Sequence, residues 1–301
     1  MRILVTDGMN KAAMETLRAD GHEIVEQFYE PDQLGAALRD FDAVIVRSKT
    51  KVRAKHIDEA KGGKLKLVIR GGVGVDNIDV AYAEANGVAV RNTPKASSQS
   101  VAELAMAHMF SCARYISVAG ASMRQGKWEK KTYEKGVELY GKTLGIIGFG
   151  RIGQRLCAMA KAMGMKVVAF DIFHIPGIEE QLGMRYVELD ELFAQSDFIS
   201  LHTPAIDGKP LINAENIAKM KDGVIFVNTS RGNNVDEAAL LAALDCGKIR
   251  AAGLDVFAEE PTANAALYSH PAVSATPHIG GATAEAQGRI GEEIVEIVRS
   301  F

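Results

Sequence analysis

The sequence contains few cysteines, and it has no long, uninterrupted run of apolar residues. Its 301 residues include three cysteines, Cys112, Cys157 and Cys246, which are widely spaced and lie in apolar surroundings. An odd number at such spacing argues against a disulfide framework and favours a reducing compartment. Three scattered cysteines also cannot form a zinc cluster, and we expect no metal site.

The longest apolar stretch, residues 101–118, is interrupted by Glu103, His108 and Arg114. A membrane-spanning helix needs about 20 predominantly apolar residues, so we expect no such helix and no membrane partner. The N-terminus has only a short apolar run before Asp7 and lacks a small-residue cleavage site, which argues against a signal peptide. We therefore expect a cytoplasmic protein.

The sequence also lacks an excess of charge of either sign. Its 35 Lys and Arg residues nearly balance 38 Asp and Glu residues, which gives a net charge of −3 at pH 7. This balance excludes the broad basic surface of a nucleic-acid binder but leaves room for a local basic site. Hydrophobic residues at 47% and charged residues at 24% are typical of a globular protein. At roughly 150 residues per domain, the length predicts two domains.

Short β-branched runs alternate with helical segments twice along the chain, over residues 3–90 and again over residues 143–276. Each alternation predicts a parallel sheet with helices on both faces. Between them we predict one long helix over residues 98–124, whose apolar side, including His108, is interpreted as a buried packing or dimer face. The fold class is therefore α/β, with two Rossmann-like doubly wound domains and an active-site cleft between them.

The last segment, residues 283–301, has apolar residues at helical spacing. Because the second array of strands is already complete, we place this helix on the first domain, which makes that domain discontinuous. The predicted domains are residues 1–95 with 283–301, which would bind substrate, and residues 96–282, which would bind a dinucleotide.

The strongest local signal is the segment LGIIGFGRIG, a strand followed by Gly148, Gly150 and Gly153 and then by a helix. In this context the first glycine permits a tight turn, the second lets the backbone approach a pyrophosphate, and the third lets helix and strand pack closely. The helix N-terminus offers free N–H groups to the phosphates. A glycine-rich structural turn is the alternative interpretation.

Asp171 ends the next strand, at about the spacing at which a carboxylate accepts hydrogen bonds from the adenosine ribose hydroxyls. A 2′-phosphate beside this carboxylate would meet a like charge. No arginine follows immediately in DIFHIPG, so the sequence favours NAD over NADP.

Three further residues follow predicted strands of the second sheet: Arg231 in NTSRG, Glu260 in GLDVFAEEP and His278 in ATPHIGG. The carboxyl ends of the strands form the edge at which open α/β sheets bind their ligands. Taken singly, these residues could be a structural ion pair, a surface charge and a turn histidine.

The chain resembles the NAD-dependent D-2-hydroxyacid dehydrogenase family over nearly its whole length. The resemblance rests on an ordered series of motifs: GGVGVDNID, NTP, AEL, GKW, GKTLGIIGFGRIG, LHTP, NTSRGNNVDEAAL, GLDVFAEEP and TPHIGGAT. Within the family the chain is most similar to the phosphoglycerate dehydrogenases, in a short form without a C-terminal regulatory domain. The resemblance implies hydride transfer between NAD and C2 of a D-2-hydroxy acid.

The resemblance also implies roles for individual residues. His278 would be the acid and base, Glu260 its partner and Arg231 the substrate anchor. These roles suit the chemistry, because histidine titrates near neutral pH and a guanidinium binds a carboxylate in two places. Asp255, assigned to the nicotinamide end, could instead cap a turn. The cofactor would contact Gly148, Gly150, Arg151, Ile152, Gly153, Asp171, Thr203, Pro204, Thr229, Ser230, Asp255 and Gly280.

Substrate binding is expected in the first domain. The backbone N–H groups of Gly71, Gly72, Val73 and Gly74 would bind the substrate carboxylate as an anion-binding nest does. Arg47 and Arg70, at strand ends, and Lys49 close by would bind a phosphate; solvated surface charges are the alternative for Arg47 and Lys49.

The best expectation for the reaction is conversion of 3-phosphoglycerate to 3-phosphohydroxypyruvate, the first step of serine biosynthesis. A glyoxylate or hydroxypyruvate reductase is an alternative, since it would not require the phosphate-binding cations. A non-catalytic, NAD-sensing co-repressor-like scaffold is a further alternative, and we expect a homodimer formed through the cofactor domain.

Overall fold

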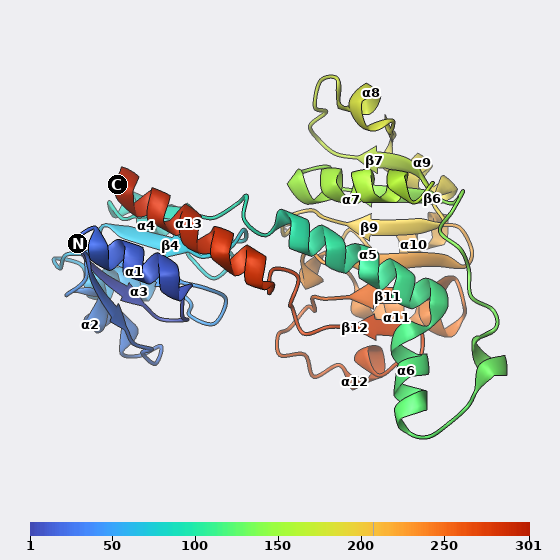
Figure 1. The fold of residues 1–301 in the computed structure, drawn as a ribbon, viewed down its shortest axis with the longest axis horizontal. Coiled ribbons are helices and arrows are strands. Elements are labelled where there is room, and N and C mark those ends of the chain that lie inside the picture. Colours follow the sequence, from blue (N-terminus) through green and yellow to red (C-terminus); the bar gives the residue numbers. More distant parts are fainter. Residues whose placement is uncertain (207) are drawn as a thin grey trace. The chain divides into compact units, whose positions relative to one another are not determined.

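The computed structural model describes residues 1–206 and 208–301, which form two compact units. The first unit comprises Met1–Ser98 and Gly281–Phe301, and the second comprises Gln99–Gly280. Each unit contains one parallel sheet flanked by helices (Figure 1). Within the two described ranges, no helix is long and apolar enough to cross a membrane.

The first unit has a five-stranded sheet in the order β2-β1-β3-β4-β5. Its strands are β1 (Arg2–Val5), β2 (Glu23–Glu26), β3 (Ala43–Val46), β4 (Leu67–Arg70) and β5 (Ala89–Asn92). Its helices are α1 (Lys11–Ala19), α2 (Leu34–Leu38), α3 (Ala54–Ala60), α4 (Val80–Ala85) and α13 (Ala284–Ser300). The direction of winding reverses between β1 and β3, and ligands of open α/β sheets bind at such a reversal.

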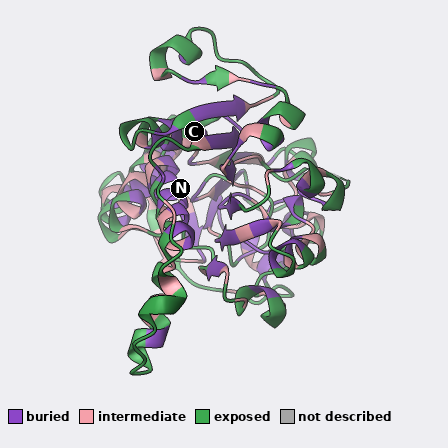
Figure 2. Ribbon diagram, turned by 90° about the vertical axis from the view of Figure 1, so that its right-hand side faces the viewer, coloured by how far each residue is buried: buried purple, intermediate pink, exposed green. Residues whose placement is uncertain are grey.

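Both faces of this sheet are covered, which explains its continuous apolar strands. All four residues of β3, for example, are buried, as expected for a parallel strand between two layers of helices. On one face α13 buries Ile290 and Ile294 against the sheet, alongside Ala13 and Leu17 of α1. Thr283 caps the first turn of α13 by accepting the N–H of Ala286 at 3.1 Å. Most strands are drawn as buried in Figure 2, whereas the edge strands β2 and β8 have no buried residue.

The second unit has a seven-stranded sheet in the order β12-β11-β10-β9-β6-β7-β8, and all its pairings are parallel. Its strands are β6 (Thr143–Ile147), β7 (Lys166–Phe170), β8 (Arg185–Tyr186), β9 (Phe198–Leu201), β10 (Val224–Asn228), β11 (Ile249–Leu254) and β12 (Val273–Ala275). Its helices are α5 (Ser98–Arg114), α6 (Ile116–Arg124), α7 (Arg151–Ala162), α8 (Ile178–Leu182), α9 (Leu189–Gln195), α10 (Ala214–Lys219), α11 (Glu237–Asp245) and α12 (Ala265–Tyr268), with 3₁₀ turns η1 (Lys130–Tyr133) and η2 (Gly232–Asn234). This sheet reverses its winding between β6 and β9.

The prediction of one helix over residues 98–124 was wrong, because the helix breaks at Tyr115. Tyr115 adopts a left-handed backbone with φ of 59°, so α5 ends at Arg114 and α6 begins at Ile116. The Tyr115 hydroxyl accepts a hydrogen bond from Arg250 at 2.8 Å and itself donates to the Lys135 carbonyl at 3.4 Å. These tertiary partners hold a conformation that a single sequence does not reveal.

The contact between α13 and α1 predicts opposite effects for two glycine substitutions in the same helix. At Gly288 a Cβ would meet no atom within 4 Å, whereas at Gly291 it would lie 2.7 Å from the Ala13 Cβ. Gly288→Ala should raise the free energy of unfolding by about 0.5–1 kcal/mol through helix propensity. Gly291→Ala should lower it by about 1–3 kcal/mol through overpacking. Urea denaturation measures both, and equal effects would contradict this packing.

Candidate active site

The glycine-rich loop after β6 has the geometry that a bound pyrophosphate requires. Gly148 has φ of 91°, and a Cβ there would lie 2.8 Å from the His202 carbonyl carbon, so only glycine fits. At Gly153 a Cβ would lie 2.5 Å from the Gly148 oxygen, which keeps helix α7 tight against the loop. At Gly150, which precedes α7, a Cβ would meet nothing within 4 Å. The loop is thus closed on the protein side and open at Gly150, beside the N-terminus of α7.

Asp171, directly after β7, is fixed by two backbone groups. One carboxylate oxygen accepts the N–H of Phe149 at 2.6 Å, and the other accepts the N–H of Phe173 at 3.0 Å. The first bond ties the carboxylate to the glycine-rich loop. A carboxylate has about four acceptor positions, so acceptor capacity is left for two ribose hydroxyls.

The segment LHTP begins with the last residue of β9, on the other side of the reversal from β6. Asn234, which is fully buried, holds it by donating to the Thr203 hydroxyl at 3.0 Å and to the Pro204 carbonyl at 2.8 Å. Burial lowers the pKa of His202 to about 4, so its ring is neutral at physiological pH. The ring contacts the Ser200 hydroxyl at 2.8 Å.

The loop after β10 carries Thr229, Ser230 and Arg231. Asn228 organises it, because its side-chain oxygen accepts the N–H of Ser230 at 2.9 Å and its amide donates to the Arg231 carbonyl at 2.9 Å. The Thr229 hydroxyl is buried and has no hydrogen-bond partner within residues 1–206 and 208–301. A buried hydroxyl of this kind suits a polar ligand group that the protein alone does not provide.

Glu260 and His278 lie together at the ends of β11 and β12. The Nδ1 atom of His278 is 2.6 Å from a carboxylate oxygen of Glu260, and the two side chains are 41% and 38% exposed. Burial by itself raises the pKa of Glu260, but the hydrogen bond and charge of His278, the Phe257 N–H and the charge of Arg231 together hold that pKa below its ordinary value. Glu260 is therefore ionised at neutral pH, and the second ring nitrogen of His278 is left for another partner.

The loop that carries His278 is wrapped around Asp255. The Asp255 carboxylate accepts the Thr276 hydroxyl at 2.6 Å and the N–H groups of Ile279 and Gly280, each at 2.8 Å. The Asp255 carbonyl accepts the N–H of His278 at 2.8 Å. The side chain of Asp255 thus caps this turn, as the alternative interpretation from sequence expected, and its contact with nicotinamide stays a prediction.

In the first unit, Arg47 follows β3 at the reversal of the sheet. Asp7, which follows β1, accepts the N–H groups of Arg47 at 2.8 Å and Thr50 at 2.9 Å. The Asn77 amide donates to the carbonyls of Arg47 and Thr50, each at 2.7 Å. Four hydrogen bonds therefore fix the backbone of residues 47–50.

The predicted nest begins beside this loop. The Arg47 Cγ lies 3.7 Å from the place of a Cβ on Gly71, and the Arg70 guanidinium occupies the place of a Cβ on Gly72. Gly72 has φ of 151°. Both arginines thus lie against the glycines, while the Lys49 ammonium lies 3.8 Å above the ring of Phe28.

Sequence reasoning assigned no role to four residues that shape these loops: Asp7, Asn77, Asn228 and Asn234. The three asparagines occur inside motifs that the sequence displays, DNID and NTSRGNN. A buried asparagine as the last residue of a strand is the signal that could have identified Asn228, which is 1% exposed.

Comparison with known proteins places these features in a family. Residues 106–280 match the model of the D-isomer specific 2-hydroxyacid dehydrogenase NAD-binding domain. The chain belongs to the D-isomer specific 2-hydroxyacid dehydrogenases. It is thus an NAD-dependent enzyme acting on a small molecule, and its matched region lies in the second unit.

Two curated members of the family differ in how much of their length the chain covers. A hydroxypyruvate reductase of Thermotoga maritima is 50% identical over 98% of this chain and 96% of its own length. A D-3-phosphoglycerate dehydrogenase of Methanocaldococcus jannaschii is 44% identical over 99% of this chain, which spans only 57% of that relative. Among solved structures, a glyoxylate reductase from Paecilomyes thermophila matches with a TM-score of 0.90 and 31% identity, over 100% of this chain and 94% of that one.

The residues present fit the NAD that the family binds. The open side of Gly150 at the α7 N-terminus suits the pyrophosphate, Asp171 suits the adenosine ribose, and the buried Thr229 hydroxyl suits a polar group of the nicotinamide half. Among the remaining predicted contacts, Arg151 and Ile152 lie in the first turn of α7 and Ser230 lies on the loop after β10, and these contacts stay predictions.

The position of Asp171 predicts a change in cofactor preference. Asp171→Ala should weaken NAD binding by about tenfold or more, because a charged hydrogen bond is typically worth about 1.5–3 kcal/mol. NADP binding should weaken less, since the like charge near its 2′-phosphate disappears. Fluorescence titration with NADH and NADPH measures both affinities.

As a control, Asp190→Ala removes an exposed carboxylate that pairs with Lys219 and should change neither affinity. An unaltered NADH to NADPH ratio in Asp171→Ala would contradict the ribose assignment.

Proposed function

We propose that this enzyme interconverts 3-phosphoglycerate and 3-phosphohydroxypyruvate, and so catalyses the first step of serine biosynthesis. One observation carries the choice of substrate. The Arg47 guanidinium lies at the reversal of the first sheet, on a backbone held by Asp7 and Asn77, and makes no hydrogen bond or ion pair to a residue that the structure describes. A half-buried cation held in this way suits a phosphate group.

His278 serves as the acid and base in this proposal. In oxidation its free ring nitrogen takes the proton of the C2 hydroxyl, and in reduction the imidazolium returns a proton to the C2 oxygen. The hydrogen bond from Nδ1 to Glu260 fixes the ring and stabilises its charged form. NAD, when bound, supplies the hydride acceptor or donor.

Arg231 binds the substrate carboxylate and polarises the C2 oxygen of the 2-oxo acid. The Asn228 hydrogen bonds hold the Arg231 loop, and the charge of the guanidinium helps to lower the pKa of Glu260. In this proposal the N–H groups of residues 71–74 in the first unit also bind substrate. The first unit would thus contribute substrate contacts alone, whereas the second unit would carry the cofactor contacts together with Arg231 and His278.

Hydroxypyruvate is the second candidate substrate. The Thermotoga maritima relative named hydroxypyruvate reductase matches along 96% of its own length, whereas the phosphoglycerate dehydrogenase relative is matched along only 57%. Hydroxypyruvate differs from 3-phosphohydroxypyruvate only in lacking the phosphate, so His278, Glu260 and Arg231 would keep their roles.

We also propose that the enzyme forms a homodimer through its second unit. Ile116 and Met123 of α6 are 58% and 54% exposed, and Trp128 in the segment after α6 is 79% exposed. Large apolar side chains gathered on one exposed segment are typical of a protein interface.

Arg47 distinguishes the two substrates. Arg47→Ala should raise KM for phosphohydroxypyruvate by about tenfold or more, the loss expected for one charged hydrogen bond, and should leave KM for hydroxypyruvate and glyoxylate within about twofold. Steady-state kinetics with all three acids measures this. Arg53→Ala is the control, because Arg53 is already paired with Asp79. Equal effects on all three acids would refute the phosphate assignment.

The pair His278 and Glu260 predicts a change in pH dependence. His278→Ala should lower kcat by about 10²–10⁴ and leave NADH affinity unchanged. Glu260→Gln removes the carboxylate that stabilises the imidazolium, so protonation requires a lower pH. The acidic limb of kcat/KM for oxidation should therefore move to lower pH.

In reduction, which requires the protonated ring, the activity of Glu260→Gln should be lost at a lower pH as pH rises. Near-normal kcat in His278→Ala, together with an unmoved limb in Glu260→Gln, would overturn the assignment of both residues.

A further inference from the structure

His108 of α5 is a polar side chain buried where α5 crosses β11 and β12. It is 2% exposed, and sequence reasoning treated it only as part of an apolar packing face. The fold makes room for it, because Gly253 of β11 has no side chain and a Cβ there would lie 2.5 Å from the His108 Cβ. A buried imidazole admitted by a glycine, when an apolar residue would fill the same space, requires an explanation.

Both ring nitrogens of His108 have partners, and the partners fix the direction of the hydrogen bonds. Nδ1 lies 3.1 Å from the Ser274 hydroxyl, and Nε2 lies 3.0 Å from the Thr276 hydroxyl. The Thr276 hydroxyl donates its only proton to Asp255 at 2.6 Å, so it must accept from His108. Nε2 therefore carries a proton, and in the neutral ring Nδ1 accepts the Ser274 proton.

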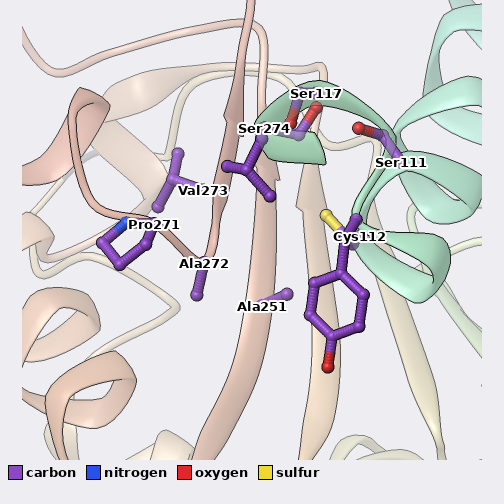
Figure 3. A pocket seen from close by; sticks show the side chains of 10 residues that line it. Ser111, Cys112, Ser117, Ala251, Pro271, Ala272, Val273 and Ser274 are labelled. Carbon is purple, nitrogen blue, oxygen red and sulfur yellow. The ribbon is translucent and has the colours of Figure 1, made fainter. Parts of the chain in front are cut away.

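The ring of His108 is neutral in this arrangement. Burial lowers the pKa of His108, and the charge of Asp255 opposes that effect without overcoming it. On the Ser274 side, the pocket at the junction of α5, α6, β11 and β12 is lined by uncharged residues (Figure 3). Asp255 is thus the charged group that acts on His108 in the described structure.

The chain of hydrogen bonds ends on the loop that carries His278. Asp255 binds the Thr276 hydroxyl and the N–H groups of Ile279 and Gly280 with its carboxylate, and the N–H of His278 with its carbonyl. His278 itself has a left-handed backbone with φ of 54°. A conformation of this kind costs free energy and persists only where its surroundings determine it.

We propose that His108 is a positioning residue for His278. By donating to Thr276, it orients the Thr276 hydroxyl toward Asp255 and so fixes the loop of residues 276–280 in the conformation that presents the His278 ring to Glu260. The proposal rests on the catalytic role of His278 proposed above, whereas the effect of His108 on the loop does not depend on that role.

Two amide substitutions separate the hydrogen bond to Ser274 from the hydrogen bond to Thr276. His108→Gln places an amide near the position of Nε2 and can still donate to Thr276. His108→Asn places an amide near the position of Nδ1, which reaches Ser274 and not Thr276. Both side chains are polar and neutral, so the two variants differ chiefly in which of these two hydrogen bonds they retain.

We expect the loop to loosen in the asparagine variant alone. Hydrogen exchange, followed by mass spectrometry of peptides covering residues 276–280, should accelerate about tenfold in His108→Asn and stay near the wild-type rate in His108→Gln, as the loss of one hydrogen bond predicts. Met109→Ala is the control, because Met109 is fully buried on the same helix and takes no part in this series of hydrogen bonds. It should lower global stability without a selective change in this loop.

Activity gives the second readout. With whichever 2-oxo acid the wild-type enzyme reduces, kcat should fall about tenfold in His108→Asn, and KM for NADH should stay unchanged. His108→Gln should keep most of the activity. Equal exchange rates and equal kcat in the two amide variants would overturn the proposal. If the wild type reduces none of the acids tested, the proposed function fails, whereas the exchange experiment still decides the role of His108.

Discussion

The buried carboxylate of Asp255 is the constraint on which the candidate active site depends. A charge that is 1% exposed is costly unless hydrogen bonds replace its water. Three donors do so here, and all three belong to residues 276–280. Satisfying that charge therefore requires the loop after β12 to fold back over the end of β11. The unusual backbone of His278 follows from this requirement, and its short hydrogen bond to Glu260 becomes possible as a result.

At other strand ends of the second sheet, other polar side chains fix loops by hydrogen bonds, as Asp255 does. Asp171 ties its loop to the glycine-rich turn, Asn228 holds the Arg231 loop, and Asn234 holds LHTP. Each of these residues bonds mainly to backbone groups, so each fixes where a loop lies and leaves other side chains free for ligands. The parallel sheet of the second unit brings these loops to one edge, and short polar side chains then set their conformations.

The sequence predicted the parts that depend on local pattern. Alternating runs predicted both sheets, and the strands of the second sheet all lie within the predicted array of residues 143–276. The glycine spacing identified the turn after β6, because each glycine answers a local steric demand. The sequence did not predict the break at Tyr115 or the partners of His108, Asp255 and Asp7, because they depend on residues distant in the chain. His108 in particular occupies a helical position that its neighbours mark as apolar, and only the glycine on a distant strand explains why it fits.

The loop of residues 47–50 has a consequence for how substrate choice can change. Four of its hydrogen bonds to Asp7 and Asn77 involve main-chain atoms of Arg47 and Thr50, and a fifth comes from the Thr50 hydroxyl. None of them uses the side chain of Arg47 or Lys49. The shape of the loop is therefore independent of the two cations that it carries. Point substitutions, in evolution or in protein engineering, can therefore change the charge that the loop offers to a substrate while the surrounding framework is kept. Substrate specificity can then diverge without a new fold.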